Sequence, residues 1–217
     1  MLRIETDRPE SASPGSRLAV VVGLGNPGPG YAGHRHNVGA MVVAGLAADE
    51  GAHLKRGAGK LSRVVSAATR LAGRRVVLAT LTTFMNESGQ AVRALLDYYK
   101  PADLSSLIVL HDELDLPFGV VRIKQGGGDN GHNGLRSITG SLGSPDYVRI
   151  RIGIGRPVGR QSAADFVLRD FTATERTELP SILENAAHAV RLILSAGVVA
   201  AQNELHHPDR QNELHHP

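Results

Sequence analysis

Histidine, asparagine and aspartate recur in short polar segments that follow apolar runs or a glycine-rich stretch. The residues of interest are Asn26, His36, Asp112, His132 and Asn133. A histidine that is oriented by a carboxylate can remove a proton from water, and side-chain amides can bind a carbonyl group and its developing oxyanion. These residue types therefore favour a hydrolytic reaction in which a general base activates water.

The acidic segment HDELD, which follows the apolar run 107–110, leaves two interpretations open. Its carboxylates Asp112, Glu113 and Asp115 could together hold Mg²⁺ at the end of a strand. Alternatively, one of them could orient a histidine that folding brings close. The His-x-His pair that ends at His36 could also ligate a metal, although no third ligand stands nearby in the sequence.

Two glycine-rich segments could contact a ligand through their backbone. Residues 23–28, GLGNPG, match the dinucleotide signature G-x-G-x-x-G. However, Pro27 and Pro29 interrupt the turn and the helical pattern begins only near Asn37, so a dinucleotide site is disfavoured. Four of the six residues in 126–131 are glycine, which indicates either a plain hinge or close backbone contact with a ligand.

The composition excludes several kinds of site, and its charge distribution leaves two interpretations open. The chain contains no cysteine, so disulfides, thiolate metal sites and cysteine nucleophiles are excluded. Its net charge is only +3, but residues 51–80 carry seven basic side chains and no acidic one, and residues 122–160 carry seven against Asp129 and Asp146. Such segregated positive charge suits a phosphate-rich partner, although a solvated surface would show the same pattern.

The apolar pattern predicts one α/β domain with a twisted, mixed and mostly parallel β-sheet surrounded by α-helices. Strands are predicted at 18–24, 62–69, 74–81, 107–110, 119–124 and 148–154. Helices are predicted from 38, from 86 to 99, over 133–142, and over 180–194 with Pro180 in the first turn. Asn37 and Asn86 are interpreted as helix caps. Arg149 and Arg151 alternate with apolar residues, which indicates a half-buried strand.

The chain divides into a domain, predicted to span 18–203, and two terminal segments. Residues 1–17 carry charges of both signs and no apolar core, so we predict a flexible extension and no secretion signal. The longest apolar run, 18–25, is far shorter than the ~20 residues that cross a bilayer. Residues 204–217 form a tail that contains a second copy of the segment QNELHHP. We therefore expect a cytoplasmic protein without a membrane partner.

Five linked motifs closely resemble one family, the bacterial peptidyl-tRNA hydrolases. The motifs are GLGNPG with the following Tyr31, RHNVG, FMNESG, HDELDLPFG and GGGDNGHNGLRSI, and the resemblance runs from about Leu18 to Asn203. The family cleaves the ester that joins a peptide to the 3′ end of tRNA. Its members are monomeric, need no metal or other cofactor, and fold as a twisted mixed sheet wrapped by helices.

The resemblance also implies a role for each matching residue. His36 would be the catalytic base, Asp112 the carboxylate that orients it, and Asn26 a catalytic-cleft amide that helps to hold the substrate and the attacking water. The residues that would bind peptide or tRNA are Tyr31, Asn86, His132, Asn133, Lys124 and Arg151. Within that set, Tyr31 would pack beside the 3′ terminal nucleotide, and Lys124 with Arg151 would clamp the 5′ phosphate.

Two rival functions remain open at this point. One is a non-catalytic RNA-binding relative of the same fold, which the intact set of Asn26, His36, Asn86 and Asp112 argues against. The other is a Mg²⁺-dependent phosphohydrolase built on the carboxylates of the HDELD segment. The sequence therefore predicts an ester hydrolase that acts on peptidyl-tRNA, with these two alternatives for experiment to separate.

Overall fold

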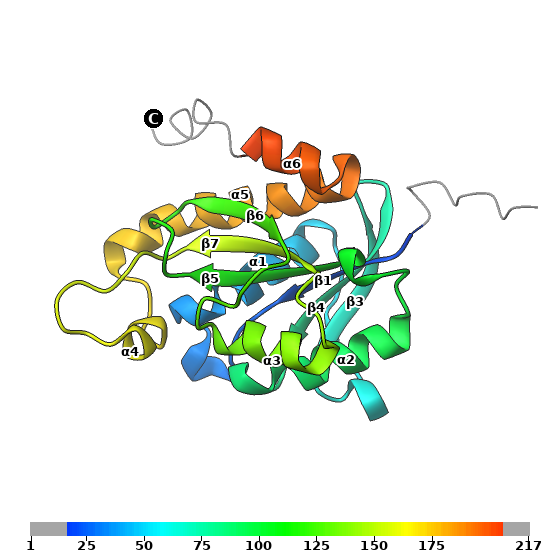
Figure 1. Cartoon of the computed structure of the whole chain (residues 1–217), viewed down its shortest axis with the longest axis horizontal. Helices are drawn as coiled ribbons and strands as arrows, with labels where there is room; N and C mark the ends of the chain where they lie inside the picture. The colour runs from blue at the N-terminus through cyan, green and yellow to red at the C-terminus, as the bar shows by residue number, and fades with distance from the viewer. Residues whose placement is uncertain (1–16, 206–217) are drawn as a thin grey trace, which may run out of the picture.

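The computed structural model describes residues 17–205, so the predicted extension up to residue 16 and the tail from residue 206 lie outside the described residues. Seven strands form one sheet in the order β2-β3-β4-β1-β5-β7-β6 (Figure 1). The strands are β1 (Ala19–Gly23), β2 (Lys55–Arg56), β3 (Val64–Leu71), β4 (Arg74–Leu81), β5 (Leu107–Glu113), β6 (Val121–Gln125) and β7 (Val148–Gly153).

The centre of this sheet is parallel and its edges are antiparallel. Strand β1 pairs in parallel with β4 on one side and with β5 on the other, and β5 pairs in parallel with β7. The outer pairs β2–β3, β3–β4 and β6–β7 are antiparallel. The mixed α/β sheet predicted from the sequence is therefore confirmed, and the carboxyl ends of β4, β1, β5 and β7 meet at one edge.

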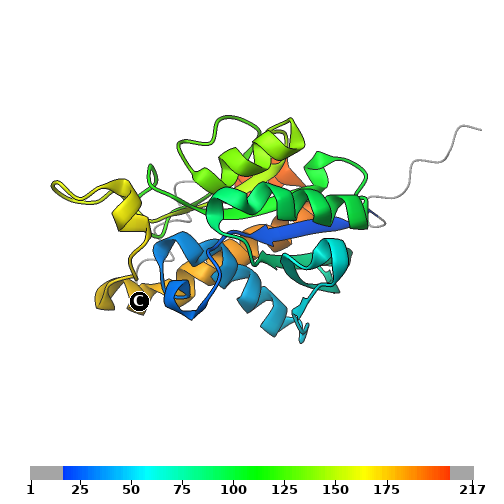
Figure 2. The ribbon, with the colours of Figure 1, turned by 90° about the horizontal axis from the view of Figure 1, so that it is seen from below.

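Helices cover both faces of the sheet, as Figure 2 shows. The helices are α1 (Val38–Asp49), α2 (Ser88–Tyr99), α3 (Asn133–Leu142), α4 (Ala163–Val167), α5 (Ala173–Ala196) and α6 (Val198–Leu205). Helices α1, α5 and α6 contribute to the core on one face, and α2 and α3 to the core on the other. No helix within 17–205 is long and apolar enough to cross a membrane.

Alternation along β1 shows why its sequence is apolar without a break. Val21 belongs to the core on the α1 side, whereas Val20 and Val22 belong to the core on the α2 side. A strand that is buried on both faces gains from apolar side chains at every position. The continuous run that predicted this strand therefore reflects its place in the middle of the sheet.

Several predicted element boundaries were wrong. Strand β5 continues to Glu113 instead of ending at Leu110, so Asp112 lies within the strand. Helix α5 begins at Ala173, and Pro180 lies inside it. The earlier start has a local cause, because Thr172 and Glu175 form a reciprocal capping box.

Other predictions about side chains were wrong as well. Helix α2 begins after Glu87, which makes no side-chain cap bond, so Asn86 is not its cap. Strand β7 is not half-buried, because Arg149 is only 3% exposed beneath the glycine-rich segment. The elements β2, α4 and α6 were not predicted.

Glycine lets helix α1 approach the sheet more closely than any other residue would allow. A Cβ atom on Gly39 would lie 2.1 Å from the carbonyl oxygen of Leu110, and one on Gly23 would lie 2.2 Å from the carbonyl oxygen of Gly39. The backbone N–H of Ala40 also donates to the carbonyl of Leu24, at 3.0 Å. The first turn of α1 is therefore held tightly against β1 and β5.

We expect Gly39→Ala to destabilise the fold by at least about 2 kcal/mol, because the new methyl group must displace backbone atoms. Gly45→Ala is the matched control on the same helix, since nothing lies within 4 Å of its Cβ position. That control should be neutral or stabilising by about 0.5–1 kcal/mol, because alanine restricts the unfolded chain. Urea unfolding of both variants checks the prediction, and equal stability of the two would contradict it.

Candidate active site

The predicted catalytic residues meet at the carboxyl edge of the central strands. Asn26 follows β1, and His36 lies in a short 3-10 helix, Arg35–Asn37, directly before α1. Asp112 comes from the end of β5, and His132 precedes α3. The fold thus gathers four side chains from segments up to 106 residues apart in sequence, as the numbers of Asn26 and His132 show.

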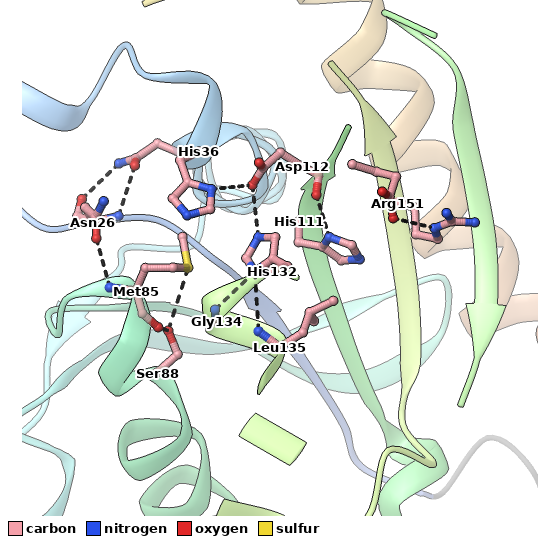
Figure 3. A network of polar contacts seen from close by, with 12 residues as sticks. Asn26, His36, Met85, Ser88, His111, Asp112, His132, Gly134, Leu135 and Arg151 are labelled. Atoms are coloured by element: carbon pink, nitrogen blue, oxygen red, sulfur yellow. Dashed lines mark hydrogen bonds and ion pairs between the residues drawn. The ribbon is translucent and has the colours of Figure 1, made fainter. Parts of the chain in front are cut away.

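One carboxylate oxygen of Asp112 binds two histidines. Its Oδ1 lies 2.8 Å from Nδ1 of His36 and 3.0 Å from Nε2 of His132. Figure 3 shows both rings pointing at Asp112, and their centroids lie 4.8 Å apart. Asp112 is 3% exposed and His36 is 8% exposed, so the three groups interact in a largely dry environment.

Hydrogen bonds assign the proton on each ring. The backbone N–H groups of Gly134 and Leu135 donate to Nδ1 of His132, at 3.1 and 3.3 Å. His132 therefore carries its proton on Nε2 and donates it to Asp112. His36 donates from Nδ1 to the same carboxylate, which leaves its Nε2 with a lone pair to accept a proton from water.

Two opposing effects act on the ionisation of Asp112. Burial alone would raise its pKa, because a dry environment disfavours the charged carboxylate. The attraction and hydrogen bonds of His36 and His132 outweigh burial and hold the pKa of Asp112 well below its usual range. The residue is therefore a carboxylate at neutral pH and acts purely as a hydrogen-bond acceptor.

The side chain of Asn26 is oriented by the backbone around it. Its Oδ1 accepts from the N–H of Met85 at 2.8 Å, so the Nδ2 group keeps its N–H donors for another partner. The backbone of Asn26 is clamped by Asn37, which accepts from its N–H and donates to its carbonyl, both at 2.9 Å. Asn26 is thus presented as a fixed donor, as an oxyanion requires.

Asn37 is a neighbour of Asn26 whose contacts the sequence did not reveal. It occupies the N-cap position of α1, as predicted, but its side chain makes no cap bond. It bonds to the backbone of Asn26 instead, and a Cβ atom on Gly25 would lie 3.0 Å from its amide. A cap and a loop clamp need the same residue type, so the sequence offered no signal to distinguish them.

The remaining predicted peptide-binding and nucleotide-binding residues line the rim of this site. Tyr31 packs edge-on against His34, at 5.2 Å between centroids, and against Phe84, at 6.1 Å. Phe84 is 52% exposed and directly precedes the 3-10 helix Met85–Glu87, which contains the exposed Asn86. Asn133 is also exposed, at the first position of α3.

The two predicted phosphate contacts lie on neighbouring strands. In the β6–β7 pairing, Arg122 is opposite Arg151 and Lys124 is opposite Arg149, so Lys124 and Arg151 are diagonal neighbours on one face. Lys124 is exposed. Arg151 is partly buried and donates from Nε to Oε2 of Glu113, at 2.9 Å. The structure therefore brings these two cations together, but apart from the histidines.

His111 is a buried residue next to the site that sequence reasoning did not separate from its acidic neighbours. Its Nδ1 lies 2.7 Å from the backbone carbonyl of Asp112, and its ring packs edge-on against His132 at 5.0 Å (Figure 3). Burial, reinforced by the neighbouring ring of His132, lowers the pKa of His111 to about 3. If the predicted strand is continued from Leu110 to Glu113, the alternation of side chains along it indicates that His111 faces inward.

The carboxylates of the HDELD segment do not share one site. Asp112 binds the histidines, Glu113 binds Arg151, and Asp115 pairs with Arg156. Among the groups described in 17–205, the one set whose potential metal ligands converge is His36, Asp112 and His132. Those nitrogens already donate their protons to Asp112, so a metal would have to replace both hydrogen bonds.

A histidine held by a carboxylate beside a fixed amide donor is an arrangement that could activate water for hydrolysis. The sequence model of the peptidyl-tRNA hydrolase family matches residues 20–213. The peptidyl-tRNA hydrolase of Frankia casuarinae is 59% identical over 187 residues, which cover 86% of this chain and 93% of that relative. That of Rhodococcus erythropolis is 53% identical and covers 87% of this chain and 97% of the relative.

A solved structure agrees with these sequence relatives. The crystal structure of peptidyl-tRNA hydrolase from Acinetobacter baumannii has a TM-score of 0.79 and 36% identity, covering 87% of this chain and 94% of that one. The chain therefore belongs to the peptidyl-tRNA hydrolase family, and the resemblance seen in its motifs is confirmed.

We predict that His111 makes folding stability depend on pH. Its pKa is about 3 in the folded state, against 6.5 for an ordinary histidine, so only the unfolded chain binds this proton as the pH falls below 6.5. Its stabilising effect is complete above that pH and is lost toward pH 3, by up to about 1.4 kcal/mol per pH unit.

Urea unfolding at pH 6.5, 5.5 and 4.5 checks this prediction. His111→Gln should lose less stability than the unmodified protein over that range, because glutamine binds no proton. The exposed His53 provides the control, and His53→Gln should keep the original pH dependence. Parallel pH profiles for His111→Gln and the unmodified protein would contradict the prediction.

Proposed function

We propose that this chain hydrolyses the ester between the peptide and the 3′ end of peptidyl-tRNA, with His36 as general base. Membership of the peptidyl-tRNA hydrolase family supports the reaction. The observation that carries the mechanism is the arrangement of His36, which donates from Nδ1 to Asp112 and keeps Nε2 for a proton from water.

In this mechanism, Nε2 of His36 takes a proton from water as the water oxygen attacks the ester carbonyl. The carbonyl oxygen becomes an oxyanion, and the Nδ2 donors of Asn26 stabilise it. The tetrahedral intermediate then collapses, and the ribose oxygen leaves with the proton from His36. Asp112 stays ionised throughout, keeps the ring in one tautomer and stabilises the imidazolium that forms.

We propose that His132 acts mainly by fixing Asp112. Both of its ring nitrogens are engaged, one by Asp112 and the other by the backbone of α3. It therefore offers a substrate only the carbon edge of its ring. The hydrogen bond that His132 donates to Asp112 restricts the rotation of the carboxylate. It thereby fixes the position of the oxygen that accepts from His36.

The rim residues are proposed to bind the two ends of the substrate. Tyr31 with Phe84 provides an aromatic surface for the 3′ terminal nucleotide, and the exposed amides Asn86 and Asn133 suit the polar backbone of a peptide. Lys124 and Arg151 are proposed to bind the 5′ phosphate of the tRNA. Further proposals are a domain over 18–203 that acts as a cytoplasmic monomer and needs no metal or cofactor.

One assay separates this function from the two rivals. N-acetyl-aminoacyl-tRNA is incubated with the protein, with and without a chelator. Turnover that survives chelation is expected, whereas the absence of turnover would favour a non-catalytic RNA-binding protein. Loss of turnover with chelator would favour a Mg²⁺ enzyme, although the separate partners of Asp112, Glu113 and Asp115 argue against such a site.

We predict that His36 and Asp112 act as one unit in catalysis. His36→Ala should lower kcat by roughly 10²–10⁴, the effect of losing a general base. Asp112→Asn should lower it less, since the imidazole remains but is poorly oriented. The double variant should be little worse than His36→Ala alone, because residues that act as a unit are not additive.

Steady-state kinetics of the three variants measures these losses, with His53→Ala as an exposed histidine control. Binding of a non-hydrolysable substrate should change little in any variant. If the two single losses instead multiply in the double variant, His36 and Asp112 do not form one base.

We predict that Lys124→Ala and Arg151→Ala each weaken tRNA binding and leave turnover of a minimal ester largely intact. Each lost phosphate contact should flatten the slope of log affinity against log salt by up to ~0.9, the value for duplex nucleic acid. Arg191→Ala removes the same charge on α5, where Arg191 pairs with Asp49 and Glu184. An unchanged slope in both test variants would remove Lys124 and Arg151 from the tRNA site.

A further inference from the structure

Glu113 is a buried carboxylate that the proposed chemistry does not use. It ends β5, next to Asp112, and is only 5% exposed. Its Oε2 accepts from Nε of Arg151 at 2.9 Å and from Nδ2 of Asn130 at 3.2 Å, while its Oε1 accepts from the N–H of Asp115 at 3.2 Å. Three donors thus converge on one side chain, and both carboxylate oxygens are needed to satisfy them.

The arginine that Glu113 binds belongs to a crowded group of cations. In the β6–β7 pairing, Arg122 lies opposite Arg151 and Lys124 lies opposite Arg149, with one rung between the two pairs, so that all four side chains share one face. Like charges that face each other across two strands destabilise a sheet. Four cations on one face of this pairing suit an anionic ligand there.

The contact with Glu113 determines how Arg151 can meet such a ligand. A guanidinium is planar, so a bond from Nε fixes the plane of the group and leaves the end formed by the two Nη groups for another acceptor. No residue in 17–205 accepts a hydrogen bond from those Nη groups, and the side chain is 18% exposed. The pair of Nη groups is therefore directed for two parallel bonds to phosphate oxygens.

Asn130 extends the same contact to the glycine-rich segment. It donates to the oxygen that Arg151 uses, and it has a left-handed backbone conformation with φ of 49°. Two residues later the chain reaches His132, which binds Asp112. One carboxylate thus joins the cationic face to the segment that completes the active site.

We infer that Glu113 is a positioning residue that aims Arg151 at the 5′ phosphate of the tRNA. This inference rests on the proposed contact between Arg151 and that phosphate. The alternative is that Glu113 competes with the phosphate for Arg151. The two roles predict opposite effects, because removing a positioning group weakens phosphate recognition whereas removing a competitor strengthens it.

The test compares N-acetyl-aminoacyl-tRNA with and without its 5′ phosphate. The readout is the ratio of KM for the dephosphorylated substrate to KM for the phosphorylated one. Charge-assisted hydrogen bonds make a ratio of about ten or more reasonable for the unmodified protein. Because both substrates meet the same variant, a general loss of activity does not change the ratio.

We expect Arg151→Ala to bring this ratio close to one and Glu113→Gln to lower it at least about threefold. Glutamine has only one acceptor oxygen. Its NH₂ group therefore replaces one carboxylate oxygen and faces a donor that this oxygen accepts from in the unmodified protein. Glu113→Asp keeps the charge but retracts the oxygens, and it should also lower the ratio. Thermal unfolding identifies any variant that does not fold. One folded variant of Glu113, either Glu113→Gln or Glu113→Asp, is enough for the test.

Asn130→Gly is the matched control, because it removes the other bond to Oε2, accepts the left-handed backbone and leaves the pair of Glu113 with Arg151. Its ratio should stay at the original value. The positioning role of Glu113 would be overturned if Arg151→Ala lowers the KM ratio but Glu113→Gln or Glu113→Asp leaves it at or above the value of the unmodified protein. A ratio near one in the unmodified protein would overturn the phosphate contact itself and leave the hydrolase function standing.

Discussion

The site depends on a single buried oxygen, Oδ1 of Asp112, which accepts a hydrogen bond from His36 and another from His132. Two donors on one oxygen hold the carboxylate ionised and prevent it from rotating. This bond in turn decides that His36 carries its proton on Nδ1 and keeps Nε2 as a hydrogen-bond acceptor. Without the carboxylate, the same imidazole could adopt either tautomer and turn freely.

The rest of the fold holds the partners of that oxygen in place. Close packing at Gly39 seats the start of α1, and Arg35 ties the turn that carries His36 to the C-terminal helices. The guanidinium of Arg35 donates to the carbonyl of Asp170 at 2.8 Å, pairs with Glu175 at 2.6 Å and stacks on Phe166. Since Glu175 also caps α5, the position of His36 is coupled to the start of the longest helix described.

Neighbouring residues of β5 serve two different regions because side chains alternate along a strand. Asp112 follows Leu110 toward the α1 side, where His36 lies, and Glu113 follows Val109 toward the face of Arg151. The carboxylate that binds His36 and the carboxylate that binds Arg151 are therefore adjacent in sequence. Because Asp112 and Glu113 point to different regions, Arg151 binds Glu113 and leaves Asp112 to the histidines.

The sequence by itself determined the α/β class. Runs of β-branched residues and helical spacing of apolar residues are local signals, and the packing of the whole chain favours the same strands and helices. It also indicated Asn26, His36, Asp112 and His132, since few side chains can act as bases, donors or orienting carboxylates. Residue types alone left open which of the neighbouring carboxylates meets His36, although the family resemblance implied Asp112. Only the tertiary structure decided which ring nitrogen carries each proton, and that Asn37 clamps Asn26 instead of capping α1. Those outcomes depend on strand order and on contacts 11 to 76 residues apart, and no local pattern encodes them.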